Sequence, residues 1–273
     1  YLDFLINNNI NFNKFKTINL YGKKFNETKI IKPIIYDNFL YIVNYKSNLE
    51  IYNINDLSLV KSIDLTNLLN ENDSYPISLA AIEDKLFLSY SSGKILCLNT
   101  QGEKIWNLEL NEIVKTPIKT SKNSIFVLST DKIISIEPNS GKIIWKFEYN
   151  NNINVNQAYG GEIISLNHLL FFILPNGRVG EINTIFGDNN DSIFSKYIFK
   201  SSINNSKDKI YSYNNFLSYF DQSKYLTTFN INDNIITLDK ELIPNVKSFY
   251  YFNNSLFILD ENNFLYAYNF INN

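Results

Sequence analysis

The sequence predicts an all-β chain that folds as a β-propeller of four-stranded antiparallel blades. About six blades fit into the 273 residues, as part of a ring of seven or eight. An apolar strand pattern recurs six times, and its second apolar residues, at positions 40, 86, 125, 170, 217 and 256, lie on average about 43 residues apart. A period of ~40–50 residues with several strands per unit is typical of propellers. Aromatic residues, which favour half-buried strands, make up 15% of the chain.

Each recurring strand is followed by a second strand across a tight turn. Pairs such as Ser92-Gly93 and Asn176-Gly177 suit these turns because Gly and Asn tolerate positive φ. The partner strands are expected at residues 49–53, 94–99, 132–136, 178–183, 225–230 and 264–269. Asn is expected at turn positions where another propeller would use Gly, since the chain has only nine glycines.

The repeat runs to both ends of the sequence. Leu2–Asn7 resembles a partner strand, and residues 11–20 resemble residues 55–65, so a half-unit opens the chain and an incomplete unit closes it. We therefore expect one propeller domain over residues 1–273, incomplete at both ends. The absence of Met fits a segment of a longer gene product.

Charge and hydropathy exclude two classes of partner. The 25 basic and 27 acidic residues nearly cancel and form no long run of one sign, so we expect no nucleic-acid binding. No stretch reaches the ~18 consecutive apolar residues of a membrane span. The single cysteine, Cys97, excludes an internal disulfide and is expected in the core.

The sequence contains no recognisable catalytic or cofactor motif. The one histidine, His168, has no cysteine or second histidine beside it with which to hold a metal. Nucleophile-elbow and phosphate-binding glycine motifs are missing too. We therefore expect no catalytic residue, no cofactor and no tightly held metal, and a chain that is not an enzyme.

The two tryptophans occupy the same place in the repeat. Gly102 precedes Trp106 and Gly141 precedes Trp145 in the same G-x-x-x-W phrase, and the tryptophans lie 39 residues apart. A tryptophan buries a large area while its indole N–H seeks a carbonyl. We expect both indoles to be largely buried at blade boundaries, and all four residues to serve structural docking.

This phrase resembles a known family. Residues 135–147, with Gly141 and Trp145, are similar to the A-x-D-x-x-T-G-x-x-x-W docking motif of quinoprotein-type, or PQQ-like, repeat β-propellers, and residues 99–106 form a version one residue shorter. In that family the tryptophan wedges between neighbouring blades. The remaining units keep the strand-turn-strand outline without the tryptophan.

Two branches of this family imply different functions. The enzymes hold quinone and calcium on the propeller axis with a shell of carboxylate and amide ligands, a catalytic Asp and often adjacent cysteines, and no such set is recognisable here. The non-enzymatic branch is similar to the barrel-assembly lipoprotein BamB, whose middle part residues 158–161 and 176–179 resemble. This resemblance implies a scaffold on the periplasmic side of the outer membrane, with a lipid anchor ahead of residue 1 and a BamA-type barrel-assembly protein as its partner.

Matching residues to that branch gives a candidate partner surface on two loops. Its residues are Asn156, Gln157, Tyr159, Gly160, Lys207 and Asp208. Tyrosine is enriched in interface hot spots, but the same loops also read as solvated turns. Two other functions stay open: a PQQ-dependent dehydrogenase, and a WD40-like scaffold from an AT-rich eukaryote, against which the missing Trp-Asp and Gly-His signatures argue.

Overall fold

The computed structural model contains two compact units, Tyr1–Asp73 and Ser74–Asn273. It describes residues 31–44, 47–69, 76–114, 116–121, 123–129, 132–148, 162–166, 168–173, 179–188, 209–220, 225–242, 246–252, 255–260 and 262–269. The single domain expected over the whole chain stays a prediction. The expected strand at Leu2–Asn7 lies outside the described residues.

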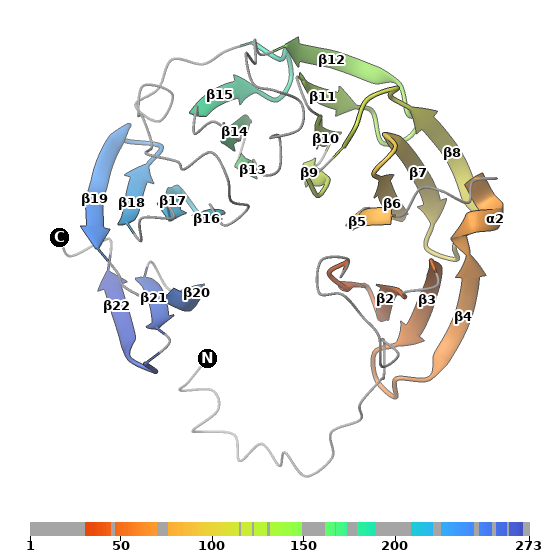
Figure 1. Ribbon diagram of the computed structural model, residues 1–273, viewed down its shortest axis with the longest axis horizontal. Coiled ribbons are helices and arrows are strands. Elements are labelled where there is room, and N and C mark those ends of the chain that lie inside the picture. Colours follow the sequence, from red (N-terminus) through yellow and green to blue (C-terminus); the bar gives the residue numbers. More distant parts are fainter. Residues whose placement is uncertain are drawn as a thin grey trace. The chain divides into compact units, whose positions relative to one another are not determined.

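The first unit holds one antiparallel sheet of order β1-β2-β3-β4, the first sheet (Figure 1). Its strands are β1 (Ile34–Tyr36), β2 (Phe39–Val43), β3 (Asn48–Asn53) and β4 (Leu59–Asp64). A five-residue helix, α2 (Leu65–Leu69), follows β4 and is the one helix among the described residues. Asp64 caps it, because its carboxylate accepts the backbone N–H of Thr66 at 2.9 Å.

The second unit holds five antiparallel sheets, each built from consecutive strands. The second sheet comprises β5 (Pro76–Ile82), β6 (Lys85–Tyr90), β7 (Lys94–Asn99) and β8 (Lys104–Glu109). The third comprises β9 (Lys119–Ser121), β10 (Ser124–Leu128), β11 (Lys132–Ile136) and β12 (Ile143–Glu148). The fourth shows β13 (Glu162–Leu166), β14 (Leu169–Ile173) and β15 (Val179–Asn183). The fifth comprises β16 (Lys209–Tyr213), β17 (Phe216–Phe220), β18 (Tyr225–Asn230) and β19 (Ile235–Leu242). The sixth shows β20 (Val246–Phe252), β21 (Ser255–Asp260) and β22 (Leu265–Asn269).

The two strand columns predicted from the sequence are confirmed. The first column corresponds to the second strand of every sheet, and the partner column corresponds to the third strand, with bounds that agree to within one residue. Every strand pairing described is antiparallel, from Ile34 with Tyr41 to Leu259 with Leu265. Asparagine does take left-handed turn positions, at Asn111, Asn214, Asn234 and Asn263.

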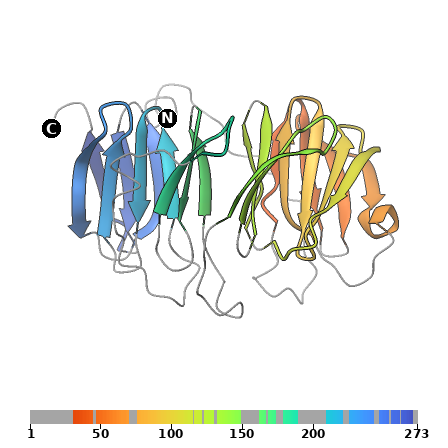
Figure 2. The ribbon, with the colours of Figure 1, turned by 90° about the horizontal axis from the view of Figure 1, so that it is seen from above.

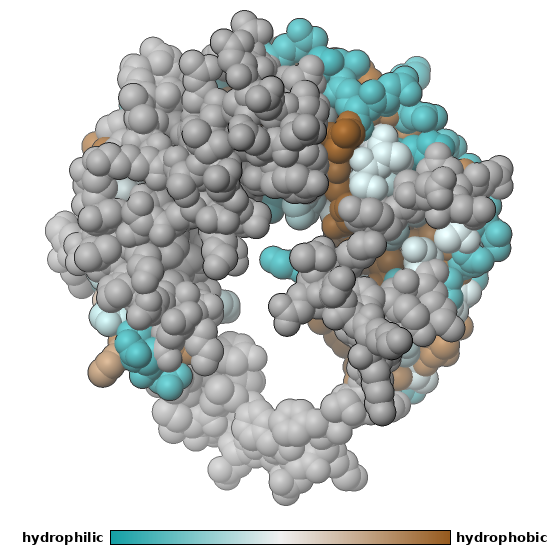
Figure 3. Space-filling model, viewed as in Figure 1, coloured by the Kyte–Doolittle hydropathy of each residue, from teal (hydrophilic) through white to brown (hydrophobic). Residues whose placement is uncertain are grey.

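Neighbouring sheets of the second unit pack face to face through apolar side chains. Phe87 and Ile95 of the second sheet share one core cluster with Ile125 and Ile134 of the third. Similar clusters join the third sheet to the fourth and the fourth to the fifth. Hydrophobic side chains gather along the seam between the second and third sheets (Figure 3), whereas the outer strands β8 and β12 expose both charged residues and the isoleucines Ile105, Ile143 and Ile144.

From the second to the fifth sheet, the first strands of successive sheets are neighbours. β5 lies beside β9, β9 beside β13, and β13 beside β16. Within each of these sheets the strands lie side by side, as Figure 2 shows from above. Consecutive four-stranded meanders that meet through their first strands are blades of a β-propeller, so the predicted fold class is confirmed.

Candidate functional site

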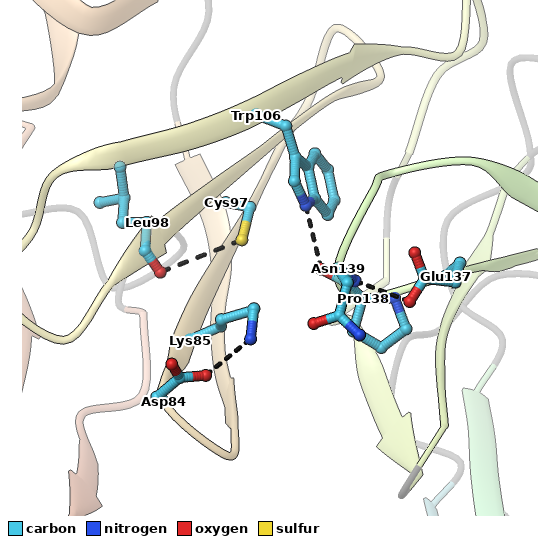
Figure 4. Close-up of polar contacts among 8 residues, drawn as sticks. All are labelled: Asp84, Lys85, Cys97, Leu98, Trp106, Glu137, Pro138 and Asn139. Atoms are coloured by element: carbon cyan, nitrogen blue, oxygen red, sulfur yellow. Dashed lines mark hydrogen bonds and ion pairs between the residues drawn. The ribbon is translucent and has the colours of Figure 1, made fainter.

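Among the described residues, the most specific set of contacts joins a tryptophan of one sheet to a turn of the next. The indole Nε1–H of Trp106, on β8, donates to the carbonyl oxygen of Pro138 at 2.9 Å (Figure 4). The indole Nε1–H of Trp145, on β12, donates to the carbonyl oxygen of Thr184 at 3.0 Å. The acceptors lie in the turns after β11 and β15, which we call docking turns (residues 137–142 and 183–188). Both indoles are partly buried.

Each docking turn carries a glycine that receives the indole. Gly141 has a φ of +71°, and a Cβ built on it would lie 2.8 Å from Cε3 of Trp106. Gly187 has a φ of +75°, and its Cβ would lie 2.7 Å from Cδ2 of Trp145. Any side chain at these positions would be strained by the backbone and would collide with the indole. Glycine is therefore required here on two independent grounds.

A β-bulge in the outer strand precedes each tryptophan. In the third sheet Ile136 pairs with Ile143 and Ser135 pairs with Trp145, so that Ile144 has no partner across the ladder. In the second sheet Leu98 pairs with Lys104 and Cys97 with Trp106, skipping Ile105. The extra residue shifts the alternation of side chains and increases the local twist, which re-aims the residues that follow.

Side chains at the end of the third strand hold the docking turns. The Glu137 carboxylate accepts the backbone N–H groups of Asn139 and Ser140 at 2.9 and 2.6 Å. The pKa of Glu137 is lowered, first by a hydrogen bond from the Ser140 side chain and then by these backbone N–H groups. Asn183 stabilises the second docking turn in the same way, because its Oδ1 accepts the N–H of Ile185 at 2.9 Å. The main-chain frame is shared as well, since Gly141 N–H donates to the carbonyl of Glu137 and Gly187 N–H to that of Asn183.

A phenylalanine ring packs against each of the two indoles. The ring centroids of Phe87 and Trp106 are 5.9 Å apart, and those of Phe126 and Trp145 are also 5.9 Å apart. Cys97, which pairs with Trp106 across the strands, is fully buried. Burial raises the pKa of its thiol to about 12. Cys97 is therefore a small core residue, as expected.

Polar contacts join the second and third sheets at a further place. Lys132, at the start of β11, donates to Glu112 Oε1 at 2.9 Å, and both side chains are partly buried. The Ile118 N–H donates to the Ser78 hydroxyl at 3.1 Å, and Ser78 and Ser89 share a hydrogen bond of 2.6 Å. Glu112 and Ile118 lie in the connection between β8 and β9. This connection is therefore fixed to both sheets.

The structure places three of the four predicted docking residues in the two contacts between a tryptophan and a docking turn, and it adds three residues that the sequence analysis missed. Trp106, Trp145 and Gly141 act as described, and Gly102 has a φ of +78° in the shorter turn after β7. Gly187 and the accepting carbonyls of Pro138 and Thr184 were not predicted. A sequence signal exists for Gly187, because Asn183 precedes it by the same four residues that separate Glu137 from Gly141.

The same turn position is occupied differently elsewhere. Leu57 and Asn234 stand in it after β3 and β18, with φ of 54° each. At the tryptophan's position, opposite the residue before the bulge, β4 has Lys61 and β19 has Leu238. Among the described strands, the tryptophan is thus confined to the second and third sheets.

The predicted partner residues lie outside the described part of the chain: Asn156, Gln157, Tyr159, Gly160, Lys207 and Asp208. The His168 side chain is exposed, and its carbonyl oxygen accepts the N–H of Thr184 at 2.9 Å. Within the described ranges, no three His, Cys, Asp or Glu residues are grouped so that they could hold a metal ion. A search of the same ranges for a helix long and apolar enough to cross a membrane finds none.

Comparisons with known proteins extend the fold assignment. No protein-family profile and no curated protein sequence matches the chain. Solved structures do match: BamB from Moraxella catarrhalis has a TM-score of 0.61 at 11% identity, over 88% of this chain and 70% of that one. Kluyveromyces lactis Hsv2 has a TM-score of 0.58 at 13% identity, over 86% of this chain and 72% of that one. The quinohemoprotein alcohol dehydrogenase ADHIIG from Pseudomonas putida HK5 has a TM-score of 0.57 at 10% identity, over 79% of this chain and 42% of that one.

Likeness at this level of identity establishes the propeller fold alone. BamB and the quinohemoprotein dehydrogenase are both similar to the chain at this level, so the likeness supports the fold and does not separate their two functions.

Proposed function

We propose that the chain is a non-enzymatic scaffold for protein–protein interaction, of the BamB kind. The observation that carries this proposal is that the polar side chains described above make structural contacts. Glu137 and Asn183 hold docking turns, the Glu112–Lys132 pair joins the connection after β8 to the third sheet, and Ser78 joins the same connection to the second sheet. A Cys97 thiol with a pKa of about 12 stays protonated at neutral pH and cannot act as a nucleophile.

The proposed partner is a BamA-type barrel-assembly protein on the periplasmic side of the outer membrane. The support is the sequence resemblance to BamB, together with the rule that loops carry binding while a rigid scaffold positions them. We propose that the contact is made by Asn156, Gln157, Tyr159 and Gly160 on one loop and by Lys207 and Asp208 on another. A lipid anchor ahead of residue 1 is part of the same proposal.

Affinity capture tests this proposal. The tagged chain is immobilised and exposed to detergent-solubilised outer membranes of a Gram-negative bacterium, and the retained proteins are identified by mass spectrometry. We expect the BamA-type protein to be retained. Its absence, with other envelope proteins bound instead, would contradict the BamB-like assignment while leaving the scaffold proposal in place.

A variant pair then locates the contact. The double variant Tyr159→Ala, Asp208→Ala is expected to weaken capture by about 2 kcal/mol, roughly 30-fold in Kd, without lowering Tm. Asn107→Ala, at an exposed position on β8, serves as the matched control and is expected to bind like the parent chain. Unchanged binding by the folded double variant would place the contact elsewhere on the propeller.

The competing function is a PQQ-dependent dehydrogenase, favoured by the tryptophan docking motif that the enzyme branch shares. Its test is reconstitution with the quinone and Ca²⁺, followed by dye reduction with alcohols and sugars as substrates. We expect no saturable activity. Activity that depends on both the quinone and Ca²⁺ would replace the scaffold proposal with the enzyme.

A further inference from the structure

No further inference is drawn: the strongest candidate, the uncharged strand β22 at the outer edge of the sixth sheet with the exposed side chains of Phe264 and Leu265 at its start, carries nothing because nothing in the described part of the chain shows what covers that edge.

Discussion

The indole of Trp145 lies so close to Gly187 that a Cβ built on the glycine would stand 2.7 Å from the indole Cδ2. We predict that Gly187→Ala lowers the free energy of unfolding by about 2–4 kcal/mol. About half of this loss comes from the left-handed backbone and the rest from displacing the indole. Urea titration followed by circular dichroism measures the loss.

A double-mutant cycle separates these two causes. In a Trp145→Ala background the methyl group added at position 187 meets no indole, so Gly187→Ala should cost only the backbone part, about 1–2 kcal/mol. If the two substitutions were additive, the close contact between the indole and the glycine would be wrong.

Removal of either indole is predicted to destabilise the fold strongly. Trp106→Ala and Trp145→Ala should each lower the free energy of unfolding by about 3–5 kcal/mol, because each empties a large aromatic site. Trp106→Phe keeps a ring but leaves the Pro138 carbonyl without its donor, and should cost about 1–2 kcal/mol. A loss below about 1 kcal/mol for Trp145→Ala would remove the docking role.

Leu57 is a position where glycine should be better than the native residue. Its φ of 54° lies in the left-handed region, which disfavours a bulky L-residue. We predict that Leu57→Gly raises the free energy of unfolding by about 1 kcal/mol. Asn234→Gly is the matched control, because Asn tolerates the same conformation, and it should change stability by only a few tenths. Equal gains at both positions would show that strain at Leu57 is not the cause.

The buried hydroxyl of Ser135 is predicted to be replaceable with a gain. Its Oγ is fully buried and has no hydrogen-bond partner. Ser135→Ala removes an unsatisfied polar group and should raise the free energy of unfolding by about 1 kcal/mol. Ser89→Ala, which breaks the 2.6 Å hydrogen bond to Ser78, should lower it by about 1 kcal/mol. Chemical denaturation of the two variants side by side decides the matter, and a loss at Ser135 would contradict the prediction.

The Glu112–Lys132 ion pair predicts a pH dependence of stability. Burial, the largest single influence, raises the pKa of Glu112, but hydrogen bonds from Ser129 and Lys132 and the Lys132 charge together lower it. Because the folded pKa lies below the unfolded value of about 4.3, the carboxylate stabilises the fold above that pH. This stability is lost as the pH falls through the folded pKa.

Glu112→Gln tests this dependence. The variant should be less stable than the parent chain at pH 7, and the difference should shrink as urea titrations are repeated toward pH 3. Asp84→Asn, at an exposed ion pair, is the control and should have a small effect throughout. A difference between Glu112→Gln and the parent that stayed constant with pH would contradict the assignment.

The strand columns were predictable because their signal is local. Alternating apolar residues and a tight turn define each hairpin, and Phe39 to Asn53 or Ser255 to Asn269 can be read from the sequence alone. The first strands were harder to predict. β9 is Lys119-Thr120-Ser121, which has no apolar residue to mark it as a strand, and it is seen as one through its pairing with β10.

In each contact between a tryptophan and a docking turn, the tryptophan could be predicted from the sequence, whereas the carbonyl that accepts its indole N–H could not. The G-x-x-x-W phrase singled out Trp106 and Trp145, but an indole and its receiving turn are joined across more than thirty residues. Neither the Pro138 nor the Thr184 carbonyl carries a side-chain signal, since any residue offers the same acceptor. Gly187 escaped notice because the turn containing it is not followed by a tryptophan.

Because each tryptophan lies in one sheet and the glycine that it contacts lies in the following one, this contact belongs to no single repeat. A repeat that carries both residues places its indole against the following repeat, and its glycine contacts the indole of the preceding repeat. Each boundary is therefore asymmetric. A duplicated segment of about 40 residues supplies one indole for the boundary that follows it and one glycine for the boundary that precedes it. It can therefore join the array at a boundary that already has this pair, without a compensating change in either neighbour, and the chain can lengthen by copying.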